Sequence, residues 1–185
     1  SGDIACLQLR LKDSDDATIR TATETLMPIC HSYNVPFLIN DRADLAAELG
    51  TDGVHIGIDD VSYQSARNML GDKAFIGVSC YDSIDRAMEA GDAGADYVAF
   101  GAFFPTQSKI PRANATIELL QWWNEFTILQ SVAIGGITAR NCKPLVKAGT
   151  DFLAVISAVW ECPEGAGMGV RLLNDAIAEA SASCT

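Results

Sequence analysis

Two carboxylates stand at the ends of successive apolar runs and are placed to share a cation. Asp41 follows the run Phe37–Asn40, and Asp60 follows the run Val54–Gly57 one strand–helix–strand unit further along the chain. In a parallel α/β protein the carboxyl ends of neighbouring strands lie side by side, so the two side chains are expected to meet. Mg²⁺ typically takes one or two carboxylates and fills its other positions with water and phosphate oxygens. The spacing therefore predicts a Mg²⁺ site with Asp41 and Asp60 as ligands.

Cations and amides near other strand ends indicate that the ligand beside this metal is an anion. Gln8, Arg10 and Lys12 alternate with leucines, so the three share one face of the first strand and its exit. Guanidinium and ammonium groups suit phosphate oxygens. Asn40 directly precedes Asp41, and Ser79, which ends another apolar run, offers a hydroxyl. This combination favours a pyrophosphate held with the metal.

A second anion site is expected further along the chain. The loop 101–109 mixes aromatic residues and hydroxyls with Lys109, which is typical of a lid over an anionic ligand. Gly135-Gly136 and Val155–Ser157 close the last two strands, where main-chain N–H groups can approach a phosphate. A cationic, metal-assisted site suits pyrophosphate and a neutral site suits a monophosphate. Together they suggest a reaction that joins a pyrophosphate ester to a phosphorylated acceptor.

Structural explanations compete with these roles. Asp41 and Asp60 both precede helical segments, so either carboxylate is also a candidate helix cap. The polar face of the first strand is also compatible with a solvated edge. His55 lies within an apolar run and has no acidic partner nearby in the sequence, so we expect a packed, hydrogen-bonded histidine rather than a general base.

The elements that must position these groups form an alternating pattern. Apolar runs suited to buried strands are separated by amphipathic or alanine-rich segments suited to helices. Strands that are apolar on both faces and joined by helices predict a parallel sheet, and we expect a (β/α) barrel of the TIM type with seven β-α units. A doubly wound open sheet is the alternative, although no strand is followed by a G-x-G-x-x-G loop. The seven predicted strands are Ile4–Leu9, Phe37–Asn40, Val54–Gly57, Phe75–Ser79, Tyr97–Phe103, Val132–Gly135 and Phe152–Val159.

The first strand begins close to residue 1, and a closed eight-stranded barrel requires one more β-α unit, so we expect a first unit to be missing from this chain. Open strand edges would favour pairing with another chain, which makes a homo-oligomer compatible with the sequence. Turns of the type Gly-Ala-Asp and Gly-Thr-Asp precede several strands and are interpreted as scaffold rather than as catalytic groups.

Composition narrows the classes of protein further. The chain has 185 residues, 49% of them hydrophobic, and no linker, which predicts one domain over 1–185. A net charge of −11 argues against nucleic acid as a partner. No signal peptide or membrane span is apparent, so we expect no membrane association. The six cysteines are scattered without a C-x-x-C pair, which favours free buried thiols in the cytoplasm.

The whole string of motifs resembles the thiamine phosphate synthase family, which also contains thiazole tautomerases and regulator-like paralogues. The resemblance extends over most of the chain, and the order and spacing of the motifs make it specific. The motifs are Gln8-Leu9-Arg10-Leu11-Lys12, Asn40-Asp41-Arg42, Asp52-Gly53-Val54-His55-Ile56-Gly57, Gly77-Val78-Ser79, Phe104-Pro105-Thr106, Ala133-Ile134-Gly135-Gly136-Ile137-Thr138 and Val155-Ile156-Ser157.

The resemblance implies an enzyme that joins hydroxymethylpyrimidine diphosphate to thiazole phosphate and releases pyrophosphate with the help of Mg²⁺. It implies Asp41 and Asp60 as metal ligands. The residues implied to bind the diphosphate are Gln8, Arg10, Lys12, Asn40, Ser79 and Lys109. Those implied around the thiazole phosphate are Thr106, Ser108, Gly136, Ile156 and Ser157. Arg10, Lys12 and Lys109 would act catalytically, because positive charge stabilises the departing pyrophosphate.

The sequence departs from the family pattern at a few positions, none of which removes a charged group. Ile58 replaces a commonly polar residue, Ser108 stands where threonine is usual, and Gln130-Ser131 replaces a proline-containing segment. Two rival interpretations are a non-synthesising paralogue, either a thiazole tautomerase or a regulatory phosphate-binding protein, and an unrelated phosphate-binding barrel isomerase. The paralogue predicts loss of the pyrophosphate residues, and the isomerase does not account for the motif Gln8–Lys12.

Overall fold

The computed structural model describes residues 3–106 and 113–182, and within them strands and helices alternate along the chain. The strands are β1 (Leu7–Leu9), β2 (Phe37–Asn40), β3 (Gly53–Ile56), β4 (Phe75–Tyr81), β5 (Tyr97–Gly101), β6 (Gln130–Ile134) and β7 (Phe152–Ala154). The helices are α1 (Asp16–Ser32), α2 (Ala43–Leu49), α3 (Tyr63–Leu70), α4 (Ile84–Ala93), α5 (Ile117–Phe126), α6 (Lys143–Lys147), α7 (Ser157–Trp160) and α8 (Ala166–Ala182).

The chain folds as two compact units, which are described separately. The first, called here the N-terminal unit, comprises Ile4–Ser79 and Glu89–Asp96. The second, called here the C-terminal unit, contains Cys80–Met88 and the chain from Tyr97 onward. The prediction of a single domain over 1–185 stays a prediction.

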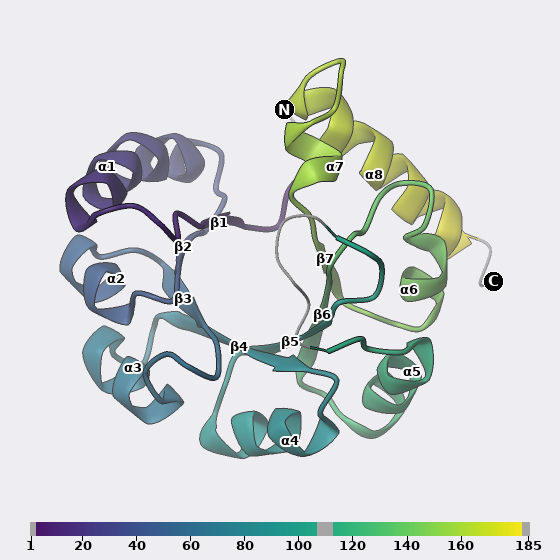
Figure 1. Ribbon diagram of the computed structural model, residues 1–185, viewed down its shortest axis with the longest axis horizontal. Coiled ribbons are helices and arrows are strands. Elements are labelled where there is room, and N and C mark those ends of the chain that lie inside the picture. Colours follow the sequence, from purple (N-terminus) through teal and green to yellow (C-terminus); the bar gives the residue numbers. More distant parts are fainter. Residues whose placement is uncertain (1–2, 107–112, 183–185) are drawn as a thin grey trace. The chain divides into compact units, whose positions relative to one another are not determined.

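The sheet of the N-terminal unit is parallel and keeps the order of the sequence. β1 pairs with β2, β2 with β3 and β3 with β4, with Leu9 beside Ile39, Ile39 beside Val54 and Val54 beside Ile76. Figure 1 shows α1, α2 and α3 on one side of these strands. A doubly wound sheet would carry helices on both faces, so the N-terminal unit has the arrangement of a (β/α) barrel instead.

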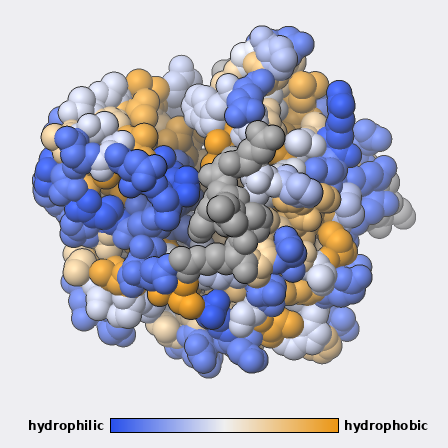
Figure 2. Space-filling view, in the orientation of Figure 1, coloured by the Kyte–Doolittle hydropathy of each residue, from blue (hydrophilic) through white to orange (hydrophobic). Residues whose placement is uncertain are grey.

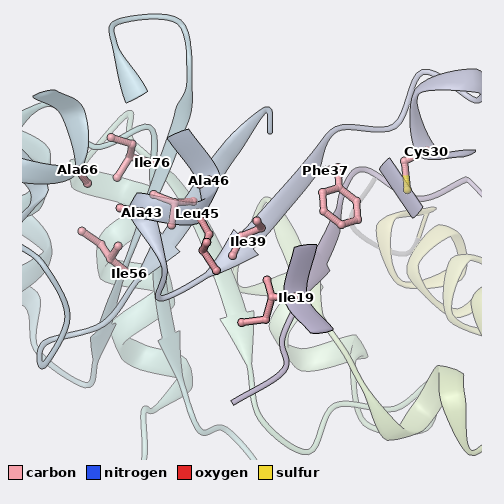
Figure 3. Close-up of a cluster of buried hydrophobic side chains, with 11 residues drawn as sticks. Ile19, Cys30, Phe37, Ile39, Ala43, Leu45, Ala46, Ile56, Ala66 and Ile76 are labelled. Carbon is pink, nitrogen blue, oxygen red and sulfur yellow. The ribbon is translucent and has the colours of Figure 1, made fainter. Parts of the chain in front are cut away.

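The core of the N-terminal unit lies between this sheet and its helices. Phe37 and Ile39 of β2 are almost fully buried, and they pack with Ile19 of α1 and Leu45 of α2 (Figure 3). Because side chains alternate along a strand, Leu38 and Asn40 of β2 point to the opposite face. The helices therefore cover Phe37 and Ile39, and the other face of the sheet carries the buried Leu38 together with polar groups such as Asn40.

The C-terminal unit repeats the parallel pattern. β5 pairs with β6 and β6 with β7. Trp123 of α5 packs edge-on against Phe100 of β5, with the ring centroids 5.3 Å apart, and its indole N–H donates to the carbonyl oxygen of Leu129 at 2.8 Å. The indole thus satisfies its one donor while the ring stays buried.

Three aspartates join successive parallel strands at their N-terminal ends. Asp52 accepts a hydrogen bond from the N–H of Phe37, Asp96 from Ile76 and Asp151 from Ser131, at 2.7, 2.8 and 2.7 Å. Each aspartate is the last residue of a Gly-Thr-Asp or Gly-Ala-Asp turn, the kind of turn that the sequence indicated as scaffold. The carboxylates occupy the end of the strands opposite to the predicted site and satisfy main-chain N–H groups there.

Strand bounds depart from the predictions at both ends of the chain. β1 is shorter than Ile4–Leu9, because its partner β2 begins at Phe37 and the preceding Pro36 has no N–H to offer. The predicted strand Phe152–Val159 is wrong in its second half, where α7 begins at Ser157 and buries Val159. A short apolar run does not by itself distinguish a buried strand from a helix.

The cysteines agree in part with the expectation of free, buried thiols. The cysteines among the described residues are free, and Cys30, Cys80 and Cys142 are buried, whereas Cys6 is exposed. Cys184 lies outside the described residues. No helix in residues 3–106 and 113–182 is long and apolar enough to span a membrane.

Candidate functional site

A row of polar side chains lines the face of the N-terminal sheet that is turned away from its helices. The amide N–H of Gln8 donates to the side-chain oxygen of Asn40 at 2.6 Å, which joins β1 to β2. Asn40 lies beside His55 in the strand register, and His55 is hydrogen-bonded to Ser79 of β4. Gln8, Asn40 and Ser79 were predicted to bind the diphosphate, and the structure brings these three residues together with His55 among them.

His55 is buried, as expected, with only 8% of its surface exposed. Its Nε2 atom lies 2.8 Å from the hydroxyl oxygen of Ser79. The sequence indicated a packed histidine and, separately, a hydroxyl at residue 79, but it did not connect them. Only the strand register, which places His55 beside Gly77 two residues before Ser79, indicates their proximity.

Asp41 lies just beyond β2 in a left-handed conformation, with a φ of 65°. Its main-chain N–H donates to the carbonyl oxygen of His55 at 2.7 Å. Left-handed backbone is unfavourable for residues other than glycine, is better tolerated by aspartate than by most, and is concentrated at functional sites. The hydrogen bond to β3 fixes the main chain of Asp41 beside His55, and a local bond from the N–H of Arg42 to the carbonyl oxygen of Asn40, at 2.8 Å, spans the same residue.

A lysine and a second carboxylate meet at Asp41. The ammonium nitrogen of Lys12 is 3.1 Å from Asp41 Oδ2. Burial and the neighbouring Asp41 carboxylate raise the pKa of Asp60, while the hydrogen bond from Gly57 and the charge of Lys12 act in the opposite sense. Asp60 accepts the N–H of Gly57 at 2.6 Å, which closes the turn after β3. Two carboxylates thus face each other beside one ammonium group.

Neither carboxylate caps a helix. The cap of α3 is Ser62, whose hydroxyl accepts the N–H of Ser65, and α2 is preceded by Arg42 without any side-chain cap. The helix-capping explanation for Asp41 and Asp60 is therefore wrong. Their proximity to each other and to Lys12 is the feature that requires another explanation.

Arg42 belongs to the scaffold beneath this site. Its guanidinium pairs with Asp16 at the start of α1 and with Asp44 in the first turn of α2. It lowers the pKa of both carboxyl groups through hydrogen bonds and charge. The network fixes the two helix N-termini on either side of the segment that carries Asp41.

The same region contains a small cavity and a hydrophilic surface. A cavity of about 100 Å³ opens between the exit of β1 and the end of β2, and its lining includes Lys12, Ser14, Asn40 and Asp41. Figure 2 shows mostly hydrophilic side chains over α1, α2 and the adjacent strand ends. Arg10 is half-buried just beyond β1, and its guanidinium makes no hydrogen bond or ion pair with a described residue. Within the described part of the chain, this guanidinium is therefore available to an anionic ligand.

The carboxylate pair fits a hard cation that is only partly held by protein. Paired carboxylates repel each other, and a divalent ion between them would remove that repulsion. Within the described part of the chain no group of three or more acidic, histidine or cysteine side chains could hold a metal ion. This donor set matches Mg²⁺, which commonly keeps water and phosphate oxygens in its remaining positions.

The second predicted site lies in the C-terminal unit, at the end of β6. Gly135 and Gly136 both have positive φ, 97° and 64°. The carbonyl oxygen of Gly135 accepts the N–H of Phe104 at 3.1 Å, and the side-chain amide of Asn141 donates to Gly136 at 2.9 Å. The N–H groups of the two glycines donate to no described residue. Two adjacent donors that no described residue engages are available to an anion at this turn.

The adjoining strand contributes a similar arrangement. Ile134 lies beside Ala154 in the register, so the glycine turn adjoins Ile156 and Ser157 after β7. The N–H of Ser157 donates to no described residue. Thr106 is half-buried at the end of the described loop. Ser108 and Lys109 lie outside the described residues, as does all of the predicted lid beyond Thr106.

Parallel β-α units with functional groups beyond the carboxyl ends of their strands define the class: this is an α/β fold of the TIM-barrel type, as predicted. The chain is similar to the solved structure of thiamine phosphate pyrophosphorylase from Pyrococcus furiosus, with a TM-score of 0.86 and 31% identity, over 97% of this chain and 85% of that one. The family model described as thiamine monophosphate synthase matches residues 1–159. The chain belongs to the thiamine monophosphate synthase family.

Curated relatives agree with this assignment. The chain is 51% identical to the thiamine-phosphate synthase of Rhodospirillum centenum over 174 residues, which are 94% of this chain and 84% of the relative. It is 48% identical to that of Hyphomonas neptunium over 178 residues, 94% of this chain and 80% of the relative. The family predicted from the motifs is thereby confirmed.

Proposed function

We propose that this protein is a transferase of thiamine biosynthesis that joins hydroxymethylpyrimidine diphosphate to thiazole phosphate and releases pyrophosphate. The observation that carries the proposal is that Asp41, Asp60 and Lys12 meet beyond the carboxyl ends of the first three strands. Two carboxylates beside an ammonium group suit a cation–diphosphate pair, because each partner finds the opposite charge. The family membership and the names of the relatives support the same reaction.

Asp41 and Asp60 would hold Mg²⁺, which when bound neutralises charge on the diphosphate. Lys12 and Arg10 would bind the diphosphate oxygens, and Lys109, which lies outside the described residues, is proposed as a third cation for the same ligand. Gln8, Asn40 and Ser79 would orient the diphosphate substrate with their amide and hydroxyl groups. As the bond to the diphosphate breaks, negative charge builds on the leaving group, so preorganised positive charge lowers the barrier.

The thiazole phosphate would bind at the neutral site of the C-terminal unit. The N–H groups of Gly135, Gly136 and Ser157, which donate to no residue that the structure describes, offer donors without adding charge. Ile156, Thr106 and Ser108 are proposed as its other neighbours. A monophosphate needs no metal for such binding, so the two substrates would use physically different kinds of site.

The test measures pyrophosphate release from the two substrates with and without Mg²⁺. Asp41→Asn and Asp60→Asn should each lower metal-dependent turnover far more than they weaken thiazole phosphate binding. Asp72→Asn is the matched control, since Asp72 is exposed in the turn before β4, at the opposite end of the strands. Absence of turnover by the wild type, with tight thiazole phosphate binding, would instead support a non-synthesising paralogue.

Cellular location and assembly follow as further proposals. The buried cysteines Cys30, Cys80 and Cys142 are free thiols, which suits a reducing cytoplasm. The proposed partners are small phosphorylated substrates rather than nucleic acid or membrane. Sedimentation of the purified protein would test whether it forms a homo-oligomer.

A further inference from the structure

The proposed chemistry gives no role to the buried side chain of His55. His55 lies in the middle of the polar row and is 8% exposed. Asn40 adjoins it in the register on one side, and Ser79 is hydrogen-bonded to it on the other. Buried histidines in apolar surroundings normally serve packing, but this one faces the polar side of the sheet, between two residues assigned to the diphosphate.

The hydrogen bond between His55 and Ser79 has two proton arrangements with different consequences. If Ser79 donates its proton to Nε2, the hydroxyl has no proton left for a ligand. If Nε2–H donates to the hydroxyl oxygen, the Ser79 proton is free to point elsewhere. The 2.8 Å separation accommodates both arrangements, so the ligand decides which one is useful.

The ligand proposed for this site only accepts hydrogen bonds. The oxygens of an ionised diphosphate carry no protons, so a hydroxyl that contacts them must be the donor. Ser79 then has lone pairs to offer to His55, and His55 must supply the N–H. Both the neutral Nε2–H tautomer and the imidazolium ion supply it.

We propose that His55 is a positioning residue that donates from Nε2 to Ser79 and thereby directs the Ser79 proton to an oxygen of the diphosphate. This role rests on the proposed function, because it assigns Ser79 to the diphosphate substrate. His55 does not touch the substrate in this role. It acts through Ser79: because His55 donates to the hydroxyl oxygen, the hydroxyl proton is left to donate to the diphosphate.

The main chain of His55 adds a second link to the same site. Its carbonyl oxygen accepts the N–H of Asp41 at 2.7 Å. Residue 55 thus contacts a proposed metal ligand through its backbone and a proposed diphosphate ligand through its side chain. Substitution of the side chain alters only the second link, so the two effects are separable by experiment.

The variants exploit the different reach of two amides. Glutamine places its amide nitrogen near the position of Nε2 and retains a donor to Ser79, whereas the shorter asparagine does not. We expect Ser79→Ala to lower kcat about 10–100-fold, the range for one hydrogen bond to a charged group. His55→Asn should cause a loss of similar size, and His55→Gln should recover most of it. His55→Asn should cost nothing further in the Ser79→Ala background.

A spectroscopic measurement separates this role from a packing role and from the proposed function itself. The ¹⁵N and ¹H NMR signals of His55 should show a proton on Nε2 when inorganic pyrophosphate and Mg²⁺ are bound. A proton found only on Nδ1 would overturn the proposal, as would additive losses in the double variant. Wild type that binds pyrophosphate but releases none from the substrates would refute synthase activity, while the tautomer would still decide the role of His55.

Discussion

Replacement of Gly136 by alanine is the sharpest test of the neutral phosphate site. Gly136 has a φ of +64°, and an added Cβ would lie 2.4 Å from the carbonyl oxygen of Pro105 and 2.8 Å from that of Phe104. These atoms belong to the backbone, so no side chain can rotate away. The loop after β5 or the turn after β6 must move, and the N–H groups proposed to bind phosphate would move with it.

The loss of folding stability caused by Gly136→Ala has two parts, which a control variant can separate. Left-handed backbone costs a residue other than glycine about 1–2 kcal/mol. Overpacking in a tight contact typically adds about 1–3 kcal/mol. Gly50→Ala provides the control, because Gly50 has nearly the same φ, +63°, but an added Cβ there would have no neighbour within 4 Å. Gly136→Ala should therefore show both parts and Gly50→Ala only the first.

Thermal unfolding and calorimetric titration would measure these effects. Both variants should lose stability, with the larger loss for Gly136→Ala. Gly136→Ala should bind thiazole phosphate at least about tenfold more weakly, which corresponds to about 1.4 kcal/mol, and should bind pyrophosphate with Mg²⁺ as the wild type does. Equal losses for both ligands, or equal behaviour of the two variants, would refute a separate phosphate site built on this turn.

Three further predictions concern the N-terminal unit. Lys12→Ala removes the ammonium group 3.1 Å from Asp41 and should let Mg²⁺ alone bind up to about fivefold more tightly, the limit for an exposed ion pair; weaker metal binding in a titration would contradict this. Asp96→Ala leaves the buried N–H of Ile76 without its acceptor and should lower the free energy of unfolding, measured with denaturant, by about 1–3 kcal/mol. Asp96→Asn keeps an oxygen that can accept this N–H and should retain most of that stability. Arg42→Gln should destabilise the protein at neutral pH. Because Arg42 lowers the pKa of its two partner carboxyl groups, the stability it provides is lost as pH falls through those lowered values, and the two unfolding curves should converge in acid; a constant difference would argue against the ion pairs.

Much of the fold follows from local patterns in the sequence. The runs that became β2 and β3 are short, apolar and bounded by polar or glycine residues, so their positions were predicted to within one residue. The run Phe152–Val159 was misassigned in part because β7 and α7 are both apolar, and hydrophobicity alone does not separate them. The end of a strand depends on its partner, which the sequence of the strand does not contain.

The candidate site was predictable as a set of residues but not as a set of contacts. The carboxylates at residues 41 and 60 could be paired because parallel strands end at a common edge. The hydrogen bond between His55 and Ser79 depends on register, which is a relation between strands. The main-chain hydrogen bond of Asp41 is likewise a tertiary contact, because its acceptor is supplied by β3.

The acceptor that holds Asp41 is a main-chain carbonyl, and every amino acid at position 55 provides one. Mutation of that side chain leaves the acceptor in place, so the geometry of this carboxylate is protected from most genetic change. Such a restraint leaves no signature in an alignment of side chains. The main-chain contribution of position 55 to the placement of Asp41 therefore remains constant whichever side chain the position carries.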